Sequence, residues 1–151
     1  MEPGTLDHVD FPREGSWEDE AAHRAFLAET HRFPYPPGLG YWTITLKDDP
    51  SFLGWVLMAP EDLKGPEIEV GWRLVTAARG KGYACEAASA LLEHGFRTLG
   101  LPAVVADIYM TNTASVNLAR KLGMRVRDDP DRITPTYVLW ELTREMRAAR
   151  T

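Results

Sequence analysis

Hydrophobic and polar residues follow a strand-like pattern in three segments of the first half of the chain. The segments span residues 41–46, 52–58 and 68–75, and they are rich in the β-branched, aromatic and aliphatic residues that strands favour. Short turns that contain proline separate them, at 47–50 and 61–66. Because strands joined by short turns pair antiparallel, the pattern predicts an antiparallel meander of three strands.

The second half of the chain alternates between helical and strand-like patterns. Apolar residues recur at helical spacing from Ala84 to Leu99, which predicts an amphipathic helix. A second helix is predicted at 114–122, and it ends at Gly123, a residue that suits the left-handed turn after a helix. The remaining predicted strands lie at 104–109, 124–127 and 137–142.

The segment before residue 41 carries a weaker pattern. Ser16 and Asp19 form a capping box, so a helix is predicted from there to about His31. We find no convincing first strand, because the segment 8–11 is too short to trust. The strand at 41–46 would then be an open sheet edge, which proteins normally protect. A truncated start, the N-terminal arm or a second copy of the chain in a homodimer could account for that edge.

Length and composition indicate one globular domain. The chain has 151 residues, of which 44% are hydrophobic and 26% are charged, both ordinary values. We assign 1–40 to a shortened N-terminal arm and helix, 41–142 to the core and 143–151 to a tail. The net charge of −5 argues against nucleic acid and anionic membranes as partners.

Cysteine and histidine usage exclude two kinds of site. Cys85 is the single cysteine and the four histidines show no ligand spacing, so the sequence predicts neither a disulfide framework nor a metal site. The sequence shows no signal peptide and no apolar run of membrane-spanning length. A cytoplasmic location is therefore expected.

The most informative segment is 79–84, which reads Arg-Gly-Lys-Gly-Tyr-Ala and joins a predicted strand to a predicted helix. Small residues let the backbone approach a ligand closely. The helix start presents unpaired N–H groups and the positive end of the helix dipole. Arg79 and Lys81 add positive charge. The segment therefore predicts a binding site for phosphate or pyrophosphate.

Three phosphate-binding patterns can be compared with this segment. The dinucleotide fingerprint needs a third glycine or alanine where Cys85 stands, and an acidic residue after the next strand, where the sequence has none. The nucleotide P-loop needs serine or threonine after its lysine, where this chain has Gly82. A third pattern is arginine or glutamine, two residues of any type, glycine, one of any type, and glycine or alanine. Arg79, Gly82 and Ala84 match it.

This third pattern is the acyl-CoA pyrophosphate loop of the GNAT superfamily of N-acetyltransferases, and further segments resemble that family. Residues 112–115, Asn-Thr-Ala-Ser, and 120–124, Arg-Lys-Leu-Gly-Met, resemble a signature of its ribosomal-protein N-terminal (alanine/serine) acetyltransferase-like branch. Residues 69–74 and 83–88 resemble a strand and a helix opening of the same branch. The resemblance runs from about Tyr41 to Leu142.

The resemblance implies the GNAT fold, an α+β fold with a mixed, mostly antiparallel central sheet that splays between its fourth and fifth strands. The family begins with a strand that we do not find, so the chain is expected to lack the usual first strand. The pantetheine arm of acetyl-CoA is expected in the splay, paired with the backbone of Leu74 and Val75. The pyrophosphate is expected on Arg79, Gly80, Lys81, Gly82, Tyr83 and Ala84.

The resemblance also implies roles for residues near the thioester. Asn112 is expected to contact the pantetheine arm, although a helix N-cap would explain the asparagine equally well. Ser115 is the candidate acid for the leaving thiolate, because Ala119 stands where many family members carry a tyrosine. Glu69 is the candidate base, which the acceptor needs because amines are mostly protonated near neutral pH. Glu67, on the same strand face, and a bound water are the alternatives.

The predicted function is that of an acetyl-CoA-dependent N-acetyltransferase, in which a primary amine attacks the thioester directly. Acetyl-CoA is a co-substrate, and no metal is expected. The acceptor would be a protein N-terminus or a small-molecule amine, and Tyr35, Trp42 and Tyr137 are candidates to line its pocket. The alternative from another class is a non-catalytic acyl-CoA-binding or regulatory module. A dinucleotide-binding domain is the least supported interpretation.

Overall fold

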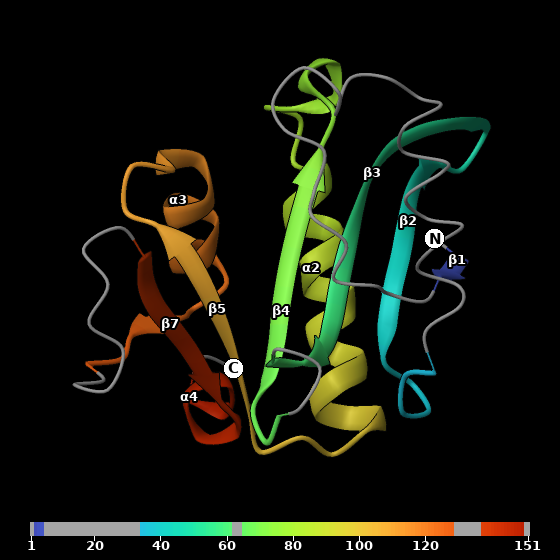
Figure 1. The fold of residues 1–151 in the computed structure, drawn as a ribbon. Coiled ribbons are helices and arrows are strands. Elements are labelled where there is room, and N and C mark those ends of the chain that lie inside the picture. Colours follow the sequence, from blue (N-terminus) through green and yellow to red (C-terminus); the bar gives the residue numbers. More distant parts are fainter. Residues whose placement is uncertain (1, 5–33, 62–64, 129–136, 150–151) are drawn as a thin grey trace.

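The computed structural model describes residues 2–4, 34–61, 65–128 and 137–149 (Figure 1). The described strands form one seven-stranded sheet in the order β1-β2-β3-β4-β5-β7-β6. The strands are β1 (Glu2–Gly4), β2 (Gly40–Leu46), β3 (Asp49–Pro60), β4 (Ile68–Leu74), β5 (Ala103–Tyr109), β6 (Arg125–Val126) and β7 (Tyr137–Thr143). The helices are η3 (Thr76–Ala78), α2 (Tyr83–Glu93), η4 (His94–Thr98), α3 (Thr113–Lys121) and α4 (Arg144–Ala148).

The antiparallel meander predicted for the first half of the chain is confirmed. β2 pairs with β3 and β3 pairs with β4, both antiparallel, so that Tyr41, Leu57 and Gly71 lie side by side across three strands. Successive residues of a strand point to opposite faces of the sheet. Met58 and Val70 therefore point to the face opposite that of Leu57 and Gly71.

A strand does precede the meander, contrary to the expectation from the sequence. β1 pairs antiparallel with β2, with Glu2 opposite Thr43 and Gly4 opposite Tyr41. The sequence pattern missed this strand because it is three residues long and contains proline and glycine, which are depleted in strands. The short segment at 8–11 and the helix predicted from Ser16 to His31 lie outside the described residues. The homodimer stays a prediction.

The sheet opens between β4 and β5, as the resemblance implies. These two strands are parallel and share one register pair, Glu69 with Val105. By contrast, β4 pairs with β3 from Ile68 to Leu74, and β5 pairs with β7 from Ala103 to Tyr109. Figure 1 shows β4 and β5 diverging toward their carboxyl ends. We refer to this opening as the splay, with its closed end at Glu69.

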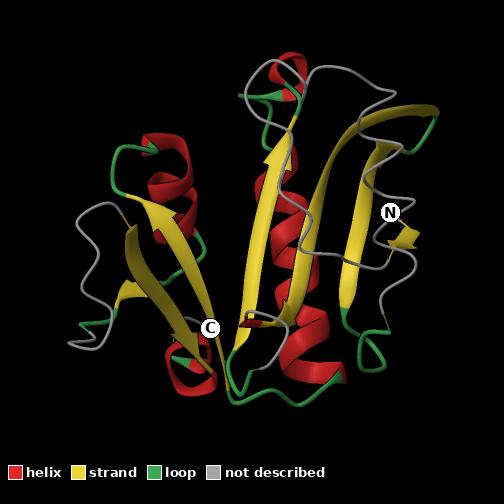
Figure 2. Ribbon diagram, in the orientation of Figure 1, coloured by secondary structure: helices red, strands yellow, loops and turns green. Residues whose placement is uncertain are grey.

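Helices cover one face of the sheet, with α2 behind β3 and β4 in the view of Figure 2. The main core joins Val56, Met58 and Val70 of the sheet to Leu91 and Leu92 of α2, and each is at most 4% exposed. This close packing holds α2 against β4, the strand that borders the splay. A second cluster, on the opposite face, consists of Tyr41, Trp55, Leu57 and Ala59.

The two helices predicted in the second half are confirmed within a few residues. The first continues from α2 into η4, where the chain follows wider π-helical turns to Thr98. The second is α3, at 113–121. The segment 143–151, assigned to a tail, contains the short helix α4, whose N-cap Thr143 accepts a hydrogen bond from the backbone N–H of Met146 at 3.1 Å.

Candidate active site

The chain passes from β4 into α2 through a glycine loop at residues 79–82, at the open end of the splay (Figure 1). Gly80 and Gly82 adopt left-handed conformations, with φ of 76° and 83°, which glycine tolerates better than other residues. A Cβ on either glycine would meet nothing within 4 Å, so the space above the loop is open. Within the described residues no side chain caps the start of α2, which leaves its first N–H groups for a ligand.

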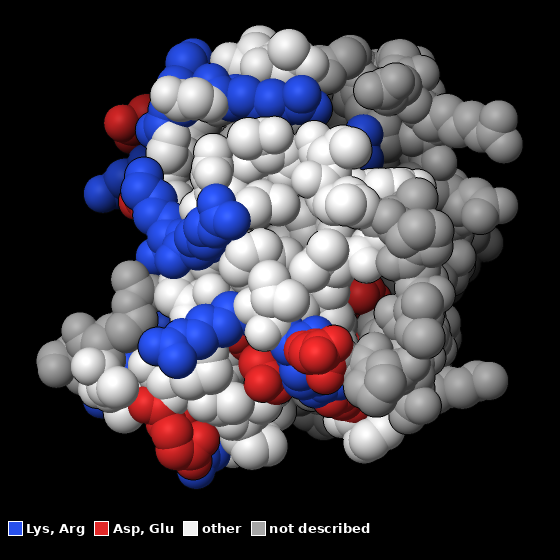
Figure 3. All heavy atoms as spheres, turned by 90° about the vertical axis from the view of Figure 1, so that its left-hand side faces the viewer, with Lys and Arg blue, Asp and Glu red and all other residues white. Residues whose placement is uncertain are grey.

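Positive charge accompanies this loop. Arg79 and Lys81 are exposed, and Nε of Arg79 donates to the carbonyl oxygen of Leu74 at 3.3 Å, which holds the arginine beside the splay. Glu86, in the first turn of α2, is exposed as well. On the side of the molecule shown in Figure 3, Lys and Arg predominate over the upper part, at the height of the loop, and most Asp and Glu lie lower. The loop region therefore suits an anion.

The backbone groups expected to pair with pantetheine differ in availability. The N–H of Val75 donates to the carbonyl of Leu53 at 2.8 Å, and its carbonyl accepts from the N–H of Ala78 at 3.0 Å. Both backbone groups of Val75 are therefore engaged within the chain. Backbone groups of successive strand residues point to opposite sides of the strand, so those of Leu74 face the splay. The carbonyl oxygen of Leu74 accepts the hydrogen bond from Nε of Arg79, so a ligand would share or displace that contact.

Two of the predicted site residues, Asn112 and Ser115, lie together at the start of α3. Asn112 is the N-cap, and its Oδ1 accepts a hydrogen bond from the backbone N–H of Ser115 at 3.2 Å. Ser115 is half-buried, whereas Ala119, one turn further along α3, is fully buried. The structure therefore confirms the N-cap at Asn112 and leaves Ser115 more accessible than Ala119.

Trp72 is a site residue that sequence reasoning missed. Its indole Nε1 donates to Oγ of Ser115 at 3.2 Å, although the two residues are 43 positions apart in the chain. The hydrogen bond connects β4 to α3 across the splay. Strand alternation is the signal that could have found it, because Trp72 shares the helix-covered face with Val70.

The two candidate bases have different surroundings. Glu69 lies at the closed end of the splay, opposite Val105, and points to the sheet face that α2 does not cover. Glu67 lies just before β4, and both of its carboxylate oxygens accept hydrogen bonds from Arg127, one of them at 2.9 Å. Arg127 also donates to Glu141 at 3.4 Å. We call Arg127 with Glu67 and Glu141 the Arg127 clamp.

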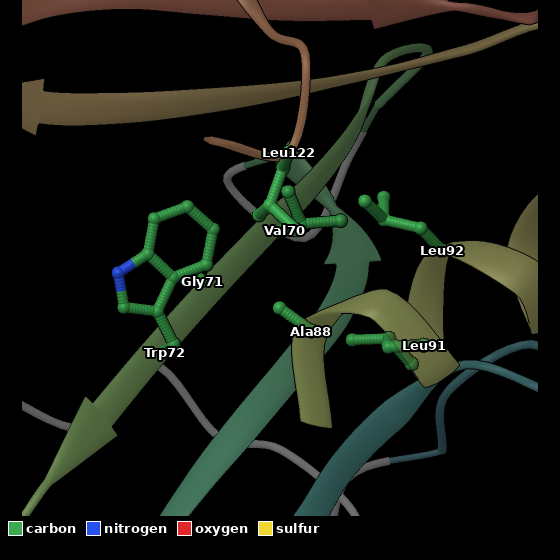
Figure 4. A pocket seen from close by; sticks show the side chains of 7 residues that line it. All are labelled: Val70, Gly71, Trp72, Ala88, Leu91, Leu92 and Leu122. Carbon is green, nitrogen blue, oxygen red and sulfur yellow. The ribbon is translucent and has the colours of Figure 1, made fainter. Parts of the chain in front are cut away.

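An apolar pocket borders the splay on the helix-covered side (Figure 4). The residues of β4 form one wall and those of α2 the other. Trp72 lies in the β4 wall, where its ring contacts apolar side chains, while its indole N–H donates to the hydroxyl of Ser115. The pocket is lined by Val70, Gly71, Trp72, Ala88, Leu91, Leu92 and Leu122.

The aromatic residues proposed for an acceptor pocket do not form one group. Tyr35 packs against the cluster around Trp55, whereas Trp42 packs against the main core on the other face. Tyr137 stacks instead on Tyr109, with ring centroids 4.0 Å apart. A side-chain hydrogen bond with Tyr109, together with partial burial, raises the pKa of Tyr137 to about 12. Both tyrosines are partly exposed at the carboxyl end of β5.

In the ranges that the structure describes, no three or more His, Cys, Asp or Glu side chains are grouped so that they could hold a metal ion. Among the described helices, none is both long enough and apolar enough to cross a membrane.

Comparison with known proteins agrees with this geometry. Residues 6–125 match the sequence profile of the family described as "Acetyltransferase (GNAT) domain". Among curated proteins, the chain is 40% identical over 82 residues to the uncharacterized N-acetyltransferase YnaD of Bacillus subtilis. The aligned segment covers 54% of this chain and 48% of the relative. The chain spans about half the length of the curated relatives it matches.

Solved structures show the same fold. An acetyltransferase from Agrobacterium tumefaciens is 26% identical with a TM-score of 0.68, over 94% of this chain and 90% of that one. Campylobacter jejuni N-acetyltransferase PseH, in complex with acetyl coenzyme A, is 14% identical with a TM-score of 0.60, over 87% and 84%. At that identity, the likeness to PseH concerns the fold alone.

Proposed function

Because this chain belongs to the GNAT acetyltransferase domain family, we propose that it transfers the acetyl group of acetyl-CoA to a primary amine. The observation that carries the proposal is the splay between β4 and β5 with the glycine loop at its open end. PseH, a protein of the same fold, is in complex with acetyl-CoA, which supports this donor.

The donor would lie along the inner edge of β4. Its pyrophosphate would bind the N–H groups at the start of α2, beside Arg79 and Lys81. The pantetheine arm would then follow β4 past Leu74, whose backbone groups face the splay. From Leu74 to Glu69 the strand extends about 17 Å, at about 3.3 Å per residue. The reactive thioester would therefore lie in the lower part of the splay, between Ser115 and Glu69.

The candidate base and acid approach this position from opposite faces of the sheet. Glu69 points to the face without α2, and Ser115 lies on the face with α2 and α3. A group inside the splay is reachable from both faces, because no strand separates them there. Glu69 is the preferred base because it lies on β4 at the closed end of the splay, opposite Val105, whereas Glu67 lies before the strand and is held by Arg127.

The reaction would proceed by direct attack. The ammonium group of the acceptor loses one proton through Glu69, directly or through a water molecule, and the neutral amine attacks the thioester carbon. A C–N bond forms and the C–S bond breaks. The second amine proton is lost, and the hydroxyl of Ser115 protonates the leaving thiolate and regains a proton from solvent. The products are an acetylated amine, CoA thiol and one proton.

The acceptor is a protein N-terminus or a small-molecule amine in this proposal. The N-terminal acetyltransferase-like signature at 112–124 favours the protein N-terminus. One observation favours the alternative of a non-catalytic acyl-CoA-binding module. Many family members use a tyrosine as the general acid, and in this chain that position is Ala119, which is fully buried and cannot protonate a leaving thiolate.

Calorimetric titration with acetyl-CoA tests the donor site, with NADH as the control ligand. We expect micromolar binding of acetyl-CoA that is lost in Gly82→Trp, because the new side chain would fill the open space above the loop. Gly100→Trp is the matched control. Gly100 also has a left-handed conformation, with φ of 67°, but it follows the far end of the α2–η4 helix.

Release of free thiol on adding amines then tests transfer. Thiol release with peptide N-termini or small amines supports the acetyltransferase, and binding without release from any amine favours the non-catalytic module. Binding of NADH in place of acetyl-CoA would reject both.

A further inference from the structure

We propose that Trp72 is a positioning residue for Ser115: its indole N–H fixes the serine hydroxyl so that the hydroxyl proton points into the splay, at the leaving sulfur of CoA. This inference rests on the proposed function, because it assigns a purpose to a hydrogen bond within the candidate active site.

Two hydrogen bonds hold Ser115, one through its backbone and one through its side chain. Oδ1 of Asn112 accepts from the backbone N–H of Ser115 at 3.2 Å, which fixes the backbone at the first turn of α3. Nε1 of Trp72 donates to the side-chain Oγ of the same serine at 3.2 Å. The first contact sets the position of the Cα–Cβ bond, and the second selects the rotamer of the hydroxyl.

Donor and acceptor chemistry then sets the direction of the proton. An indole N–H can only donate, whereas a serine hydroxyl has one proton and two lone pairs. Because Trp72 occupies one lone pair of Ser115, the hydroxyl proton has to point toward a different acceptor. The thiolate that forms in the splay is such an acceptor. A hydrogen bond received by the hydroxyl also strengthens the one that it donates.

Packing fixes the indole itself. The ring of Trp72 lines the apolar pocket with Val70, Leu91 and Leu122, and its nitrogen is turned away from the α2 residues (Figure 4). A ring packed on one side and hydrogen-bonded at its nitrogen has little rotational freedom. Because the packing against β4 and α2 restrains the indole of Trp72, its hydrogen bond restrains the hydroxyl of Ser115 on the other side of the splay.

Steady-state kinetics of four variants test this coupling: Trp72→Phe, Ser115→Ala, the double variant and Trp140→Phe. Trp72→Phe keeps an aromatic ring and removes the N–H, so we expect kcat to fall about tenfold, the size of one lost hydrogen bond, with the Kd of acetyl-CoA unchanged. In the Ser115→Ala background, the same substitution should leave kcat unchanged. Trp140→Phe is the matched control, because its Nε1 has no hydrogen-bond partner in the described part of the chain.

The indole resonances of Trp72 provide a readout that does not depend on turnover. The ¹⁵N–¹H signal that disappears in Trp72→Phe should shift in Ser115→Ala and return toward its original position in Ser115→Thr, which restores the hydroxyl. Equal losses of kcat in both serine backgrounds, no loss in Trp72→Phe, or an indole signal unmoved by Ser115→Ala would each overturn the inference. Absence of turnover in the wild type with every amine would instead reject the proposed acetyltransferase.

Discussion

The Arg127 clamp should stabilise the closed end of the splay, and Arg127→Met should reveal by how much. Exposed ion pairs contribute about 0–1 kcal/mol, whereas breaking a buried pair costs about 3–5 kcal/mol. The side chains of Arg127 and Glu67 are 25% and 35% exposed, between these limits. The pairing is bidentate, and its loss leaves Glu67 and Glu141 as neighbouring carboxylates, so we expect a loss of about 1–2 kcal/mol.

For a chain of this length, a loss of that size corresponds to a fall in Tm of about 2–8 °C. Thermal and urea unfolding of Arg127→Met measure it, and Arg97→Met is the matched control. Arg97 pairs with Glu93 at 2.9 Å, but the two side chains are 80% and 46% exposed, so its loss should lower the stability much less than the loss of Arg127 does. Arg127→Lys should cause an intermediate loss of stability, because lysine keeps the positive charge but lacks the planar guanidinium group that pairs with both carboxylate oxygens. Equal losses in Arg127→Met and Arg97→Met would refute the reasoning.

Three further predictions concern the base, a tyrosine and the core. Glu69→Gln should lower kcat by about 100-fold or more with the Kd of acetyl-CoA unchanged, because an amide cannot accept the amine proton; an unchanged kcat in thiol-release assays would indicate a water-mediated route without this base. The raised pKa of Tyr137 means that its neutral form is favoured in the folded state, so its stabilising contribution is complete below pH 10 and is lost as the pH rises toward 12. An ultraviolet phenolate titration should show one late-titrating tyrosine that disappears in Tyr137→Phe, and a titration unchanged by this substitution would contradict the assignment. Leu92→Ala should cost about 2–5 kcal/mol in urea unfolding, because Leu92 is 1% exposed; the same substitution at Leu46, which is 38% exposed, is the control, and equal losses would contradict the core assignment.

Most of the fold could be predicted from the sequence because its elements are long and regular. The meander, α2 and α3 follow from periodicity, and the splay is implied by the resemblance to the GNAT family. β1 could not be predicted, since a strand of Glu, Pro and Gly has no alternating pattern, and the pairing of its backbone with β2 is a long-range contact. The two-residue β6 and the five-residue α4 are similarly too short for periodicity to define.

The candidate site was predictable only where a local motif carries it. The glycine loop is one contiguous segment, and so is the segment around the Asn112 N-cap, so the residues of each could be named directly from the sequence. The partnership of Trp72 with Ser115 and that of Glu67 with Arg127 join segments 43 and 60 positions apart. No single-sequence pattern relates such positions, because tertiary packing alone brings them together.

The splay has a consequence for how the purified protein behaves. Above the pair of Glu69 and Val105, the backbones of β4 and β5 face each other without pairing, so the domain contains two sheet edges in its interior. Unpaired edges are templates on which another chain can add a strand. A pantetheine arm between them would mask both edges. If the proposed donor binds there, acetyl-CoA should therefore reduce aggregation, and hydrogen exchange of the backbone amides of β4 and β5 that face the splay should slow when it is added.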